Sequence, residues 1–405
     1  MSKNKNVIAL VDCDSFFVCC EQKVNPEVKG KPVSVISNKD GCVISRSREA
    51  KKLGVRMGEP LFMAKKEHPK GIYIVANHEL YSKTSHEVMA LLKDFSPTVE
   101  IYSVDEAFVD FTGLSKLYKM DYMELARYLR QKIKDELDIS VSIGLSSSKT
   151  LAKLASDKAK TNNCGVYRIN SGYIKEELKN TSIDEIWGIG RNLTKLLHSS
   201  GIITAYELVS QSDIWLDTKI GIRGLEMKHE LLGETVSPVT NYVKPPKSIQ
   251  NTRALGKFTS DINYIKNELN IHIHRGCSKL RYLGAKANII SVMLRTKDFK
   301  VFYKKKVLDK PTCYEWEVSD IIFEMLNEIY IPNILYRSSG VVLEGITYDS
   351  GEQLYLFADN NTDTKNQKLA ACLDKLESRF GKNVVKTGFV IHKDEPNSQE
   401  VVKKF

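Results

Sequence analysis

The chain lacks long hydrophobic runs and lacks paired cysteines of the kind that bind zinc. No stretch reaches the roughly 18 apolar residues that a membrane-spanning helix needs, and no charged-then-apolar leader with a small-residue cleavage site is present. The eight cysteines are scattered and form no CxxC motif, which favours reduced thiols over a disulfide framework. We therefore expect a cytoplasmic protein without membrane attachment.

Acidic residues are in the minority, since 50 Asp and Glu stand against 60 Lys and Arg, for a formal net charge of +10. Residues 244–310 hold sixteen basic and four acidic residues, a local net of +12, so this region carries the excess. Because phosphate neutralisation dominates nonspecific affinity for nucleic acids, a compact basic block predicts a domain that grips DNA or RNA. A solvated, highly charged surface is the alternative.

The length of 405 residues is too great for one ordinary core and suits two to four domains. Strand-like and helix-like segments alternate over the first part of the chain, which is typical of an α/β or α+β catalytic domain. Two prolines within Tyr242–Lys247 predict a linker, and the pattern beyond it predicts a separate domain. The elements expected there are helices at 264–283 and 318–329 and strands at 288–296 and 340–346.

Acidic residues interrupt or follow apolar segments at two places. Asp12 comes directly after a β-branched run that predicts a buried central strand. Asp105 and Glu106 are adjacent, and on a regular strand one of them would face a buried layer without compensation. We therefore expect a hairpin with arms at 100–104 and 107–111 and both acids at its apex. A solvated turn is the alternative for this pair alone.

Carboxylates that two strand ends deliver to one sheet edge make a suitable site for two Mg²⁺ ions, which prefer hard oxygen ligands. Two such ions can activate an attacking oxygen and stabilise a leaving one, so the acids favour phosphoryl or nucleotidyl transfer. A two-metal nuclease would use the same acids. A DNA-binding scaffold without activity is a further alternative.

Basic residues recur at helical spacing in two segments. Arg48 and Lys51 are three positions apart, so on a helix they share a face and can reach one anion together. A lysine-rich helix expected at 149–160 carries Lys153 and Lys160 among others. The first of these helices is therefore a candidate anion-binding site.

Two short motifs lie further along the chain. Gly188 and Gly190 join two expected short helices, with Arg191 at the start of the second, which resembles a helix-hairpin-helix whose free N-H groups can bind phosphate. A GIG sequence also fits any tight turn. The island Gln353–Phe357, QLYLF, fits either a short core strand or an extended peptide that offers its leucines and phenylalanine to a partner.

Several long motifs, taken together, resemble those of the Y-family translesion DNA polymerases, and are most similar to the bacterial UmuC class. They occur in this order: VDCDSFF, SNKDGCVISRSREAKKLGVRMGEP, YSVDEAFVD, SIGLSSSKTLAKLASDKAK and WGIGRNLTKLL. The resemblance covers nearly the whole chain and is only general in the basic second domain.

This resemblance implies roles for particular residues. Asp12, Asp105 and Glu106 match the catalytic, metal-binding acids of the family, with the main-chain carbonyl of Cys13 as a further ligand. Phe17 matches the steric gate, whose ring lies under the sugar and collides with a 2′-hydroxyl. The implied nucleotide site consists of Phe16, Phe17, Arg48, Lys51 and Lys160.

Two residues of that nucleotide site depart from the family pattern. Arg48 stands where many relatives have tyrosine, and Lys51 where many have arginine. Lysine is a point charge and cannot grip phosphate as a bidentate fork, so the triphosphate contacts are expected to differ here. Asp14 and Asp110 are acids near the site that we do not expect to be ligands.

The implied fold is an α+β multidomain right hand with a helical thumb and an α/β little finger. Its expected parts are the palm (1–11 and 78–170), fingers (12–77), thumb with helix-hairpin-helix (171–240), linker (241–247), little finger (248–350) and C-terminal tail (351–405).

The implied function is error-prone translesion synthesis by two-metal nucleotidyl transfer with Mg²⁺, in a bacterial SOS-type response. Primer-template DNA and deoxynucleoside triphosphates would be the substrates. The resemblance implies DNA contacts at Gly188, Gly190 and Arg191 and sliding-clamp contacts at Gln353, Leu354, Leu356 and Phe357. An accessory UmuD-like subunit and a recombinase filament stay open as further partners.

Overall fold

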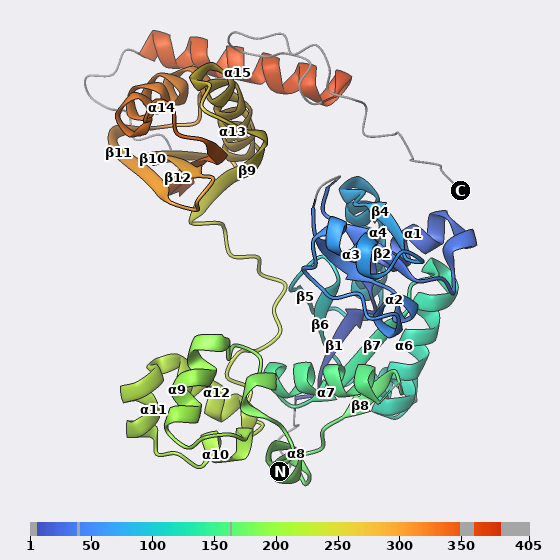
Figure 1. Cartoon of the computed structure of the whole chain (residues 1–405). Helices are drawn as coiled ribbons and strands as arrows, with labels where there is room; N and C mark the ends of the chain where they lie inside the picture. The colour runs from blue at the N-terminus through green and yellow to red at the C-terminus, as the bar shows by residue number, and fades with distance from the viewer. Residues whose placement is uncertain (1–5, 39–40, 163, 349–359, 382–405) are drawn as a thin grey trace. The chain divides into compact units, whose positions relative to one another are not determined.

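The chain forms two compact units, Met1–Val243 and Lys244–Phe405, each with its own sheets and helices (Figure 1). The computed structural model describes residues 6–38, 41–162, 164–348 and 360–381. Its mixture of several sheets with helices confirms the predicted α+β fold. Among the described residues, no helix is long and apolar enough to span a membrane.

The first unit is built on a five-stranded sheet with the strand order β5-β6-β1-β7-β8. Its strands are β1 (Ile8–Cys13), β5 (Val99–Ile101), β6 (Glu106–Asp110), β7 (Val141–Ser146) and β8 (Val166–Arg168). Every residue of β1 is buried, which confirms the central strand predicted from the apolar run. β1 runs antiparallel to both neighbours, and Asp12 lies opposite Glu106 on one side and Ser142 on the other.

Helices cover both faces of this sheet. Alternate residues of β1 point to opposite faces, and Ala9 and Val11 pack into the core that α4 (His78–Phe95) and α6 (Tyr122–Leu137) help to form. On the other face, Leu10 packs with Ala152 of α7, which spans Lys149–Thr161. The lysine-rich helix therefore lies on the sheet, beside the strand that ends in the acids.

Gly144 of β7 explains how closely α7 approaches the sheet. A Cβ at this position would lie 2.1 Å from the backbone nitrogen of Ser156 and 2.2 Å from the carbonyl oxygen of Ala152. Since these are backbone atoms that cannot turn aside, only glycine permits the contact. The close approach brings the lysines of α7 over the end of β1.

The rest of the first unit contains a small sheet and a group of helices. The sheet has the order β3-β2-β4, from β2 (Val33–Ile36), β3 (Val43–Arg46) and β4 (Ile72–Val75). The neighbouring helices are α1 (Phe16–Val24), α2 (Arg48–Lys52) and α3 (Leu61–Glu67), whereas α5 (Leu114–Tyr118) packs beside α6. The later helices are α8 (Ile174–Lys179), α9 (Arg191–Ser199), α10 (Ala205–Val209), α11 (Asp213–Ile220) and α12 (Ile222–Leu231).

The predicted hairpin is shorter than expected. β5 ends at Ile101, so its arm does not continue to residue 104. The side-chain oxygen of Ser103 accepts hydrogen bonds from the backbone N-H groups of Asp105 (3.3 Å) and Glu106 (3.1 Å), and this local turn replaces the strand ladder. Asp105 therefore lies in the turn and Glu106 is the first residue of β6.

The first helix of the predicted helix-hairpin-helix is also different. It is a single 3-10 turn, η2 (Ile183–Glu185), in which the backbone N-H of Ile186 donates to the carbonyl of Ile183 at 3.3 Å. The second helix, α9, begins at Arg191 as predicted. Gly188 has a φ of 94°, in the left-handed region that glycine adopts without strain.

The second unit is a βαββαβ fold with the antiparallel strand order β11-β10-β12-β9. Its elements are β9 (Ser248–Thr259), α13 (Ile262–Tyr282), β10 (Ala285–Thr296), β11 (Val301–Thr312), α14 (Glu315–Ile329) and β12 (Tyr336–Tyr348). The two predicted helices and two predicted strands are confirmed as α13, α14, β10 and β12. The edge strands β9 and β11 had no counterpart in the prediction.

A last helix, α15 (Asn360–Phe380), packs on this unit through a charged network. Arg281 of α13 binds Glu315 of α14 at 2.8 Å and Asp374 of α15 at 2.8 Å. Ala370 of the same helix is buried in the core of the unit. The region predicted as a C-terminal tail therefore contributes a helix to the domain.

Two histidines of α13 predict how the stability of this unit depends on pH. Hydrogen bonds with Glu315 and Glu377 raise the pKa of His274 despite its burial, whereas burial lowers the pKa of His272 to about 4. Protonated His274 stabilises the folded unit, and this stabilisation is complete below about pH 6.5. It is lost as pH rises through the raised pKa of the folded state. His272 lowers stability as pH falls from about 6.5 towards 4.

We therefore expect maximal protection of the α13 amides at about pH 6.5. Hydrogen exchange of its amides, corrected for the intrinsic pH dependence, measures this. The variant His274→Gln should flatten the alkaline side of the profile and leave the acidic side unchanged. An alkaline side that is the same in the variant and the parent would contradict the assignment.

Candidate active site

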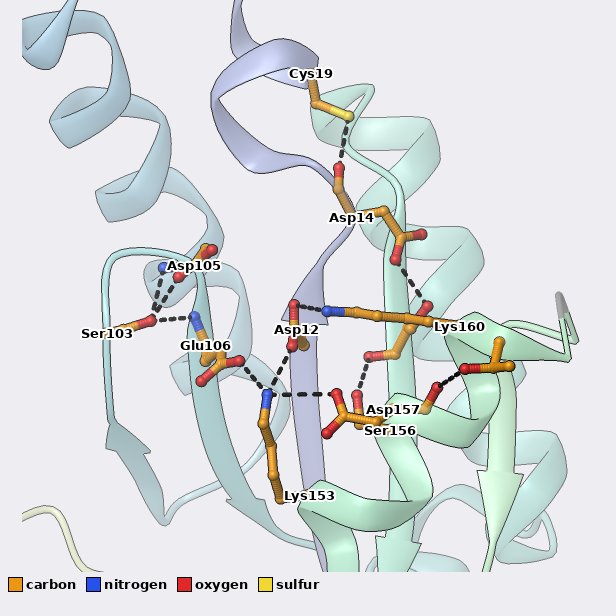
Figure 2. Close-up of polar contacts among 12 residues, drawn as sticks. Asp12, Asp14, Cys19, Ser103, Asp105, Glu106, Lys153, Ser156, Asp157 and Lys160 are labelled. Carbon is orange, nitrogen blue, oxygen red and sulfur yellow. Dashed lines mark hydrogen bonds and ion pairs between the residues drawn. The ribbon is translucent and has the colours of Figure 1, made fainter. Parts of the chain in front are cut away.

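The three predicted acids meet at one end of the five-stranded sheet (Figure 2). Asp12 lies near the end of β1 and is only 2% exposed. The backbone N-H of Cys13 donates to the carbonyl of Asp105 at 2.9 Å, which ties the turn to the central strand. The hydroxyl of Ser103 donates to Asp105 Oδ1 at 2.6 Å and fixes that carboxylate. Glu106 lies directly opposite Asp12 in the register.

Two lysines of α7 lie against these acids. Lys153 Nζ is 3.1 Å from Asp12 Oδ2, also binds Glu106 Oε1, and lies 3.6 Å from Asp157. Lys160 Nζ is 2.5 Å from Asp12 Oδ1. Each oxygen of the Asp12 carboxylate therefore has an ammonium group beside it, and Figure 2 shows both lysines reaching in from the same helix.

This arrangement separates the proton affinities of the paired acids. Burial alone would raise the pKa of Asp12, but the hydrogen bond with Glu106 and the charges of Lys160 and Lys153 outweigh it, so the pKa is lowered. Burial, together with the hydrogen bond to Asp12, raises the pKa of Glu106 to about 7. Burial opposes the charge of Lys153, yet Asp12 and Glu106 raise its pKa. The acids thus form an anionic site that draws in positive charge.

A cleft of about 460 Å³ opens over the acids. It is lined by Asp12, Cys13, Asp14, Ser15, Phe16, Phe17, Ile44, Ser45, Arg46, Ser47, Arg48, Lys51, Met57, Asp105, Glu106, Lys153 and Lys160. All the residues of the predicted metal and nucleotide sites are in this set. One cleft therefore combines carboxylates, aromatic rings and cations that come from distant parts of the chain.

Two aromatic and two basic residues of the cleft come from the short helices α1 and α2. Phe16 is buried, whereas Phe17 is partly exposed, which suits the role that the resemblance implies for Phe17. Arg48 and Lys51 lie on α2, whose N-terminus is capped by the side chain of Ser47. The two basic side chains line the same cleft, as their spacing predicted.

The two acids that we did not expect to be ligands have other partners. Asp14 Oδ1 accepts a hydrogen bond from the hydroxyl of Ser142 at 2.8 Å. Asp110 Oδ1 accepts one from the backbone N-H of Thr112 at 2.8 Å, and Asp110 does not line the cleft. The first interaction ties the segment after β1 to β7, and the second closes a local turn after β6.

The predicted DNA contacts lie away from this cleft. Gly188, Gly190 and Arg191 stand at the start of α9 and do not line it. The peptide 353–357 lies outside the described residues. A further group of possible metal ligands, Glu59, Glu67 and His68, has an arginine already in place, since Arg56 lies 3.5 Å from Glu59 and 3.3 Å from Glu67.

Lys153 and Asp157 belong to the site although the predicted site residues did not include them. They are four positions apart on α7 and lie 3.6 Å apart. Lys153 and Lys160 are seven positions apart, a spacing that places them on one helix face. The sequence therefore indicates that the two lysines share a face of α7. It does not indicate whether that face or another packs on the sheet. Lys158 of the same helix points elsewhere and binds Glu177.

Comparison with known proteins agrees with the fold and the site. The impB/mucB/samB family matches residues 11–157, and the C-terminal domain of that family matches residues 246–356. The UmuC protein of Salmonella typhimurium is 32% identical, over 94% of this chain and 92% of that protein. A DNA polymerase IV of Dehalococcoides mccartyi is also 32% identical, over 93% of this chain and 96% of that protein.

Solved structures agree with these relatives. A chimera of the Y-family DNA polymerases Dbh and Dpo4 has a TM-score of 0.72 and 28% identity, over 84% of this chain and 99% of that one. An insertion ternary complex of Dbh DNA polymerase has a TM-score of 0.59 and 27% identity, over 84% of this chain and 99% of that one. The chain therefore belongs to the Y family of DNA polymerases, and within it to the UmuC type. It is a DNA-directed DNA polymerase of the translesion class, with the multidomain fold of that family.

Proposed function

We propose that this polymerase carries out error-prone synthesis past DNA damage by two-metal nucleotidyl transfer, as part of a bacterial SOS-type response. The observation that supports this most directly is the convergence of Asp12, Asp105 and Glu106 in a cleft that also holds Phe17 and Lys160. The similarity to UmuC supports the cellular setting. Primer extension on an abasic template tests it, because the proposal expects insertion opposite the lesion, and arrest before every abasic site would contradict it.

The donor set of the site suits divalent cations. Carboxylates and a main-chain carbonyl are hard oxygen ligands, and the ammonium groups of Lys153 and Lys160 already lie against the Asp12 carboxylate. Asp12, Asp105, Glu106 and the carbonyl of Cys13 would hold two Mg²⁺ ions. When bound, these ions would lower the pKa of the primer 3′-hydroxyl and neutralise charge on the departing pyrophosphate.

The basic residues of the cleft would bind and orient the triphosphate. Lys160 binds Asp12 in this structure, so it has to exchange that carboxylate for a phosphate oxygen when nucleotide enters. Lys51 would add a point charge and Arg48 a planar fork from the same helix. Catalysis by these side chains consists of positioning and electrostatic stabilisation.

The same proposal assigns parts of the chain to DNA. The palm would comprise 1–11 and 78–170, and the fingers 12–77. The thumb would comprise 171–240, and the little finger 248–350. Gly188, Gly190 and Arg191 would contact the backbone of primer-template DNA through the N-terminus of α9. The basic second unit would grip phosphates without reading bases, which suits a polymerase that meets damaged templates.

Partners beyond DNA and deoxynucleoside triphosphates are part of the proposal. The peptide 353–357 would dock on a sliding clamp and raise the effective concentration of the enzyme at the primer end. An accessory UmuD-like subunit and a recombinase filament are proposed on the similarity to UmuC. All of these contacts would take place in the cytoplasm.

Phe17→Ala is expected to admit ribonucleotides. Overlap between a ring and an added hydroxyl costs about 1–3 kcal/mol, so removing the ring should reduce discrimination about fivefold to 150-fold. Kinetics of insertion of matched deoxyribonucleotide and ribonucleotide, compared as kcat/KM, measure this. Phe95→Leu is the control, since Phe95 is buried in the same core and does not line the cleft. Unchanged discrimination in Phe17→Ala would remove this residue from the gate.

A further inference from the structure

We infer that Tyr81 and Glu21 together support the ring of Phe17, and that this support sets how strictly the enzyme excludes ribonucleotides. The inference rests on the proposed role of Phe17 as the sugar gate. Neither of the supporting residues lines the cleft. Their effect on the sugar would therefore pass through Phe17, which makes them positioning residues.

Tyr81 connects two residues of one helix. The rings of Phe17 and Tyr81 are stacked, with centroids 4.5 Å apart and an interplanar angle of 19°. The hydroxyl of Tyr81 donates to Glu21 Oε1 at 2.6 Å. Phe17 and Glu21 are four positions apart on α1, so they lie on the same face one turn from each other. Tyr81, on α4, thus contacts both ends of a single helical turn.

Burial makes this support rigid. Tyr81 is 2% and Glu21 8% exposed, whereas Phe17 is partly exposed at the wall of the cleft. Burial raises the pKa of Glu21, and the hydrogen bond from the Tyr81 hydroxyl opposes this rise by stabilising the carboxylate. Loss of either partner would leave a buried polar group unsatisfied, which is costly.

A second contact holds the two helices together. Lys23 of α1 binds Glu87 of α4 at 3.0 Å. The helix that carries Phe17 is therefore fixed to α4 by this charged pair and by the stacked rings of Phe17 and Tyr81. Of these two contacts, only the stack involves Phe17.

A steric gate excludes a hydroxyl group only if its ring cannot move away. The stacked ring of Tyr81 blocks the movement of Phe17 towards the core, and the Glu21 hydrogen bond keeps Tyr81 from turning aside. The interaction energy of a stacked aromatic pair is large enough that its loss should change the ribonucleotide discrimination about threefold to tenfold. This is less than the whole effect of Phe17, because the ring itself stays in place.

The test is the ratio of kcat/KM for a deoxyribonucleotide to that for the matched ribonucleotide, measured with the full chain. Tyr81→Leu removes the stack and should lower the ratio about threefold to tenfold. Tyr81→Phe keeps the ring but loses the hydroxyl, so its effect should be smaller. Glu21→Gln keeps a hydrogen-bond partner and should stay near the parent. A loss of folded protein lowers both rates equally and cancels in the ratio.

Tyr118→Leu is the matched control. Tyr118 stacks on Phe95 with centroids 4.9 Å apart, and its hydroxyl donates to a backbone carbonyl, but it does not line the cleft. Its ratio should equal that of the parent. A ratio lowered equally in this control would overturn the inference, because loosening the core anywhere would then suffice.

Phe17→Ala separates failure of the inference from failure of the gate. Lost discrimination in Phe17→Ala, with an unchanged ratio in Tyr81→Leu, would overturn the support and keep the gate. An unchanged ratio in Phe17→Ala would remove the gate and the support with it. Graded loss, largest in Phe17→Ala and intermediate in Tyr81→Leu, is the expected result.

Discussion

Asp105→Asn and Glu106→Gln are each expected to lower the rate of nucleotide insertion on the order of a thousandfold. Each change keeps the size of the side chain and removes its charge, so the hard anionic oxygens that suit divalent cations are lost. Ser103 can still donate to the amide oxygen of the new residue at position 105, so the turn should persist. Single-turnover insertion of a deoxynucleotide with Mg²⁺ measures the effect.

Asp110→Asn is the matched control for these two variants. Asp110 lies at the other end of β6 from Glu106, does not line the cleft, and accepts a hydrogen bond that an amide oxygen can also accept. Its insertion rate should stay within a few-fold of the parent. Insertion at the parental rate by Glu106→Gln would place the chemistry outside this acidic cluster.

Lys153→Ala is expected to lower the free energy of unfolding substantially in the absence of metal. Lys153 binds the buried carboxylates of Asp12 and Glu106, whose side chains are 3% and 15% exposed. Removing one partner of a buried ion pair costs about 3–5 kcal/mol, and the low end applies here because Lys160 still neutralises Asp12. Denaturant unfolding in EDTA measures this loss.

Added Mg²⁺ should restore much of the stability of Lys153→Ala, because a divalent cation can replace the lost ammonium charge. Lys158→Ala is the matched control, since Lys158 lies on the same helix and binds Glu177 instead of the acids. Its stability should fall without recovery in Mg²⁺. Equal recovery in both variants would show that Lys153 is not neutralising the metal-binding acids.

The acids and the central strand could be predicted because both depend on local sequence. The apolar run of β1 and its acid are adjacent in the sequence. Two adjacent carboxylates are costly to bury within a strand, so the Asp105-Glu106 pair was expected at a strand end or turn. The nucleotide residues required the family resemblance, since nothing in the spacing of Phe17 and Lys160 states that α1 and α7 meet at one cleft. The role proposed for each of them is still a prediction.

Other features could not be predicted because distant contacts determine them. β9 and β11 are exposed edge strands rich in polar residues, so they show no clean alternation. The contact of Lys153 with the acids depends on the close approach that Gly144 permits. The packing of α15 depends on Arg281, whose partner Asp374 is more than ninety residues away.

The central claim is that Asp12, Asp105 and Glu106 form the catalytic centre of a polymerase, and one gel tests it most directly. A labelled primer on a matched template is incubated with Mg²⁺, with and without deoxynucleoside triphosphates, for the parent and for Glu106→Gln. The account predicts that the parent lengthens the primer only when the triphosphates are present, and that the variant leaves it unchanged. Primer shortened by the parent without triphosphates, or lengthened equally by the variant, would contradict it.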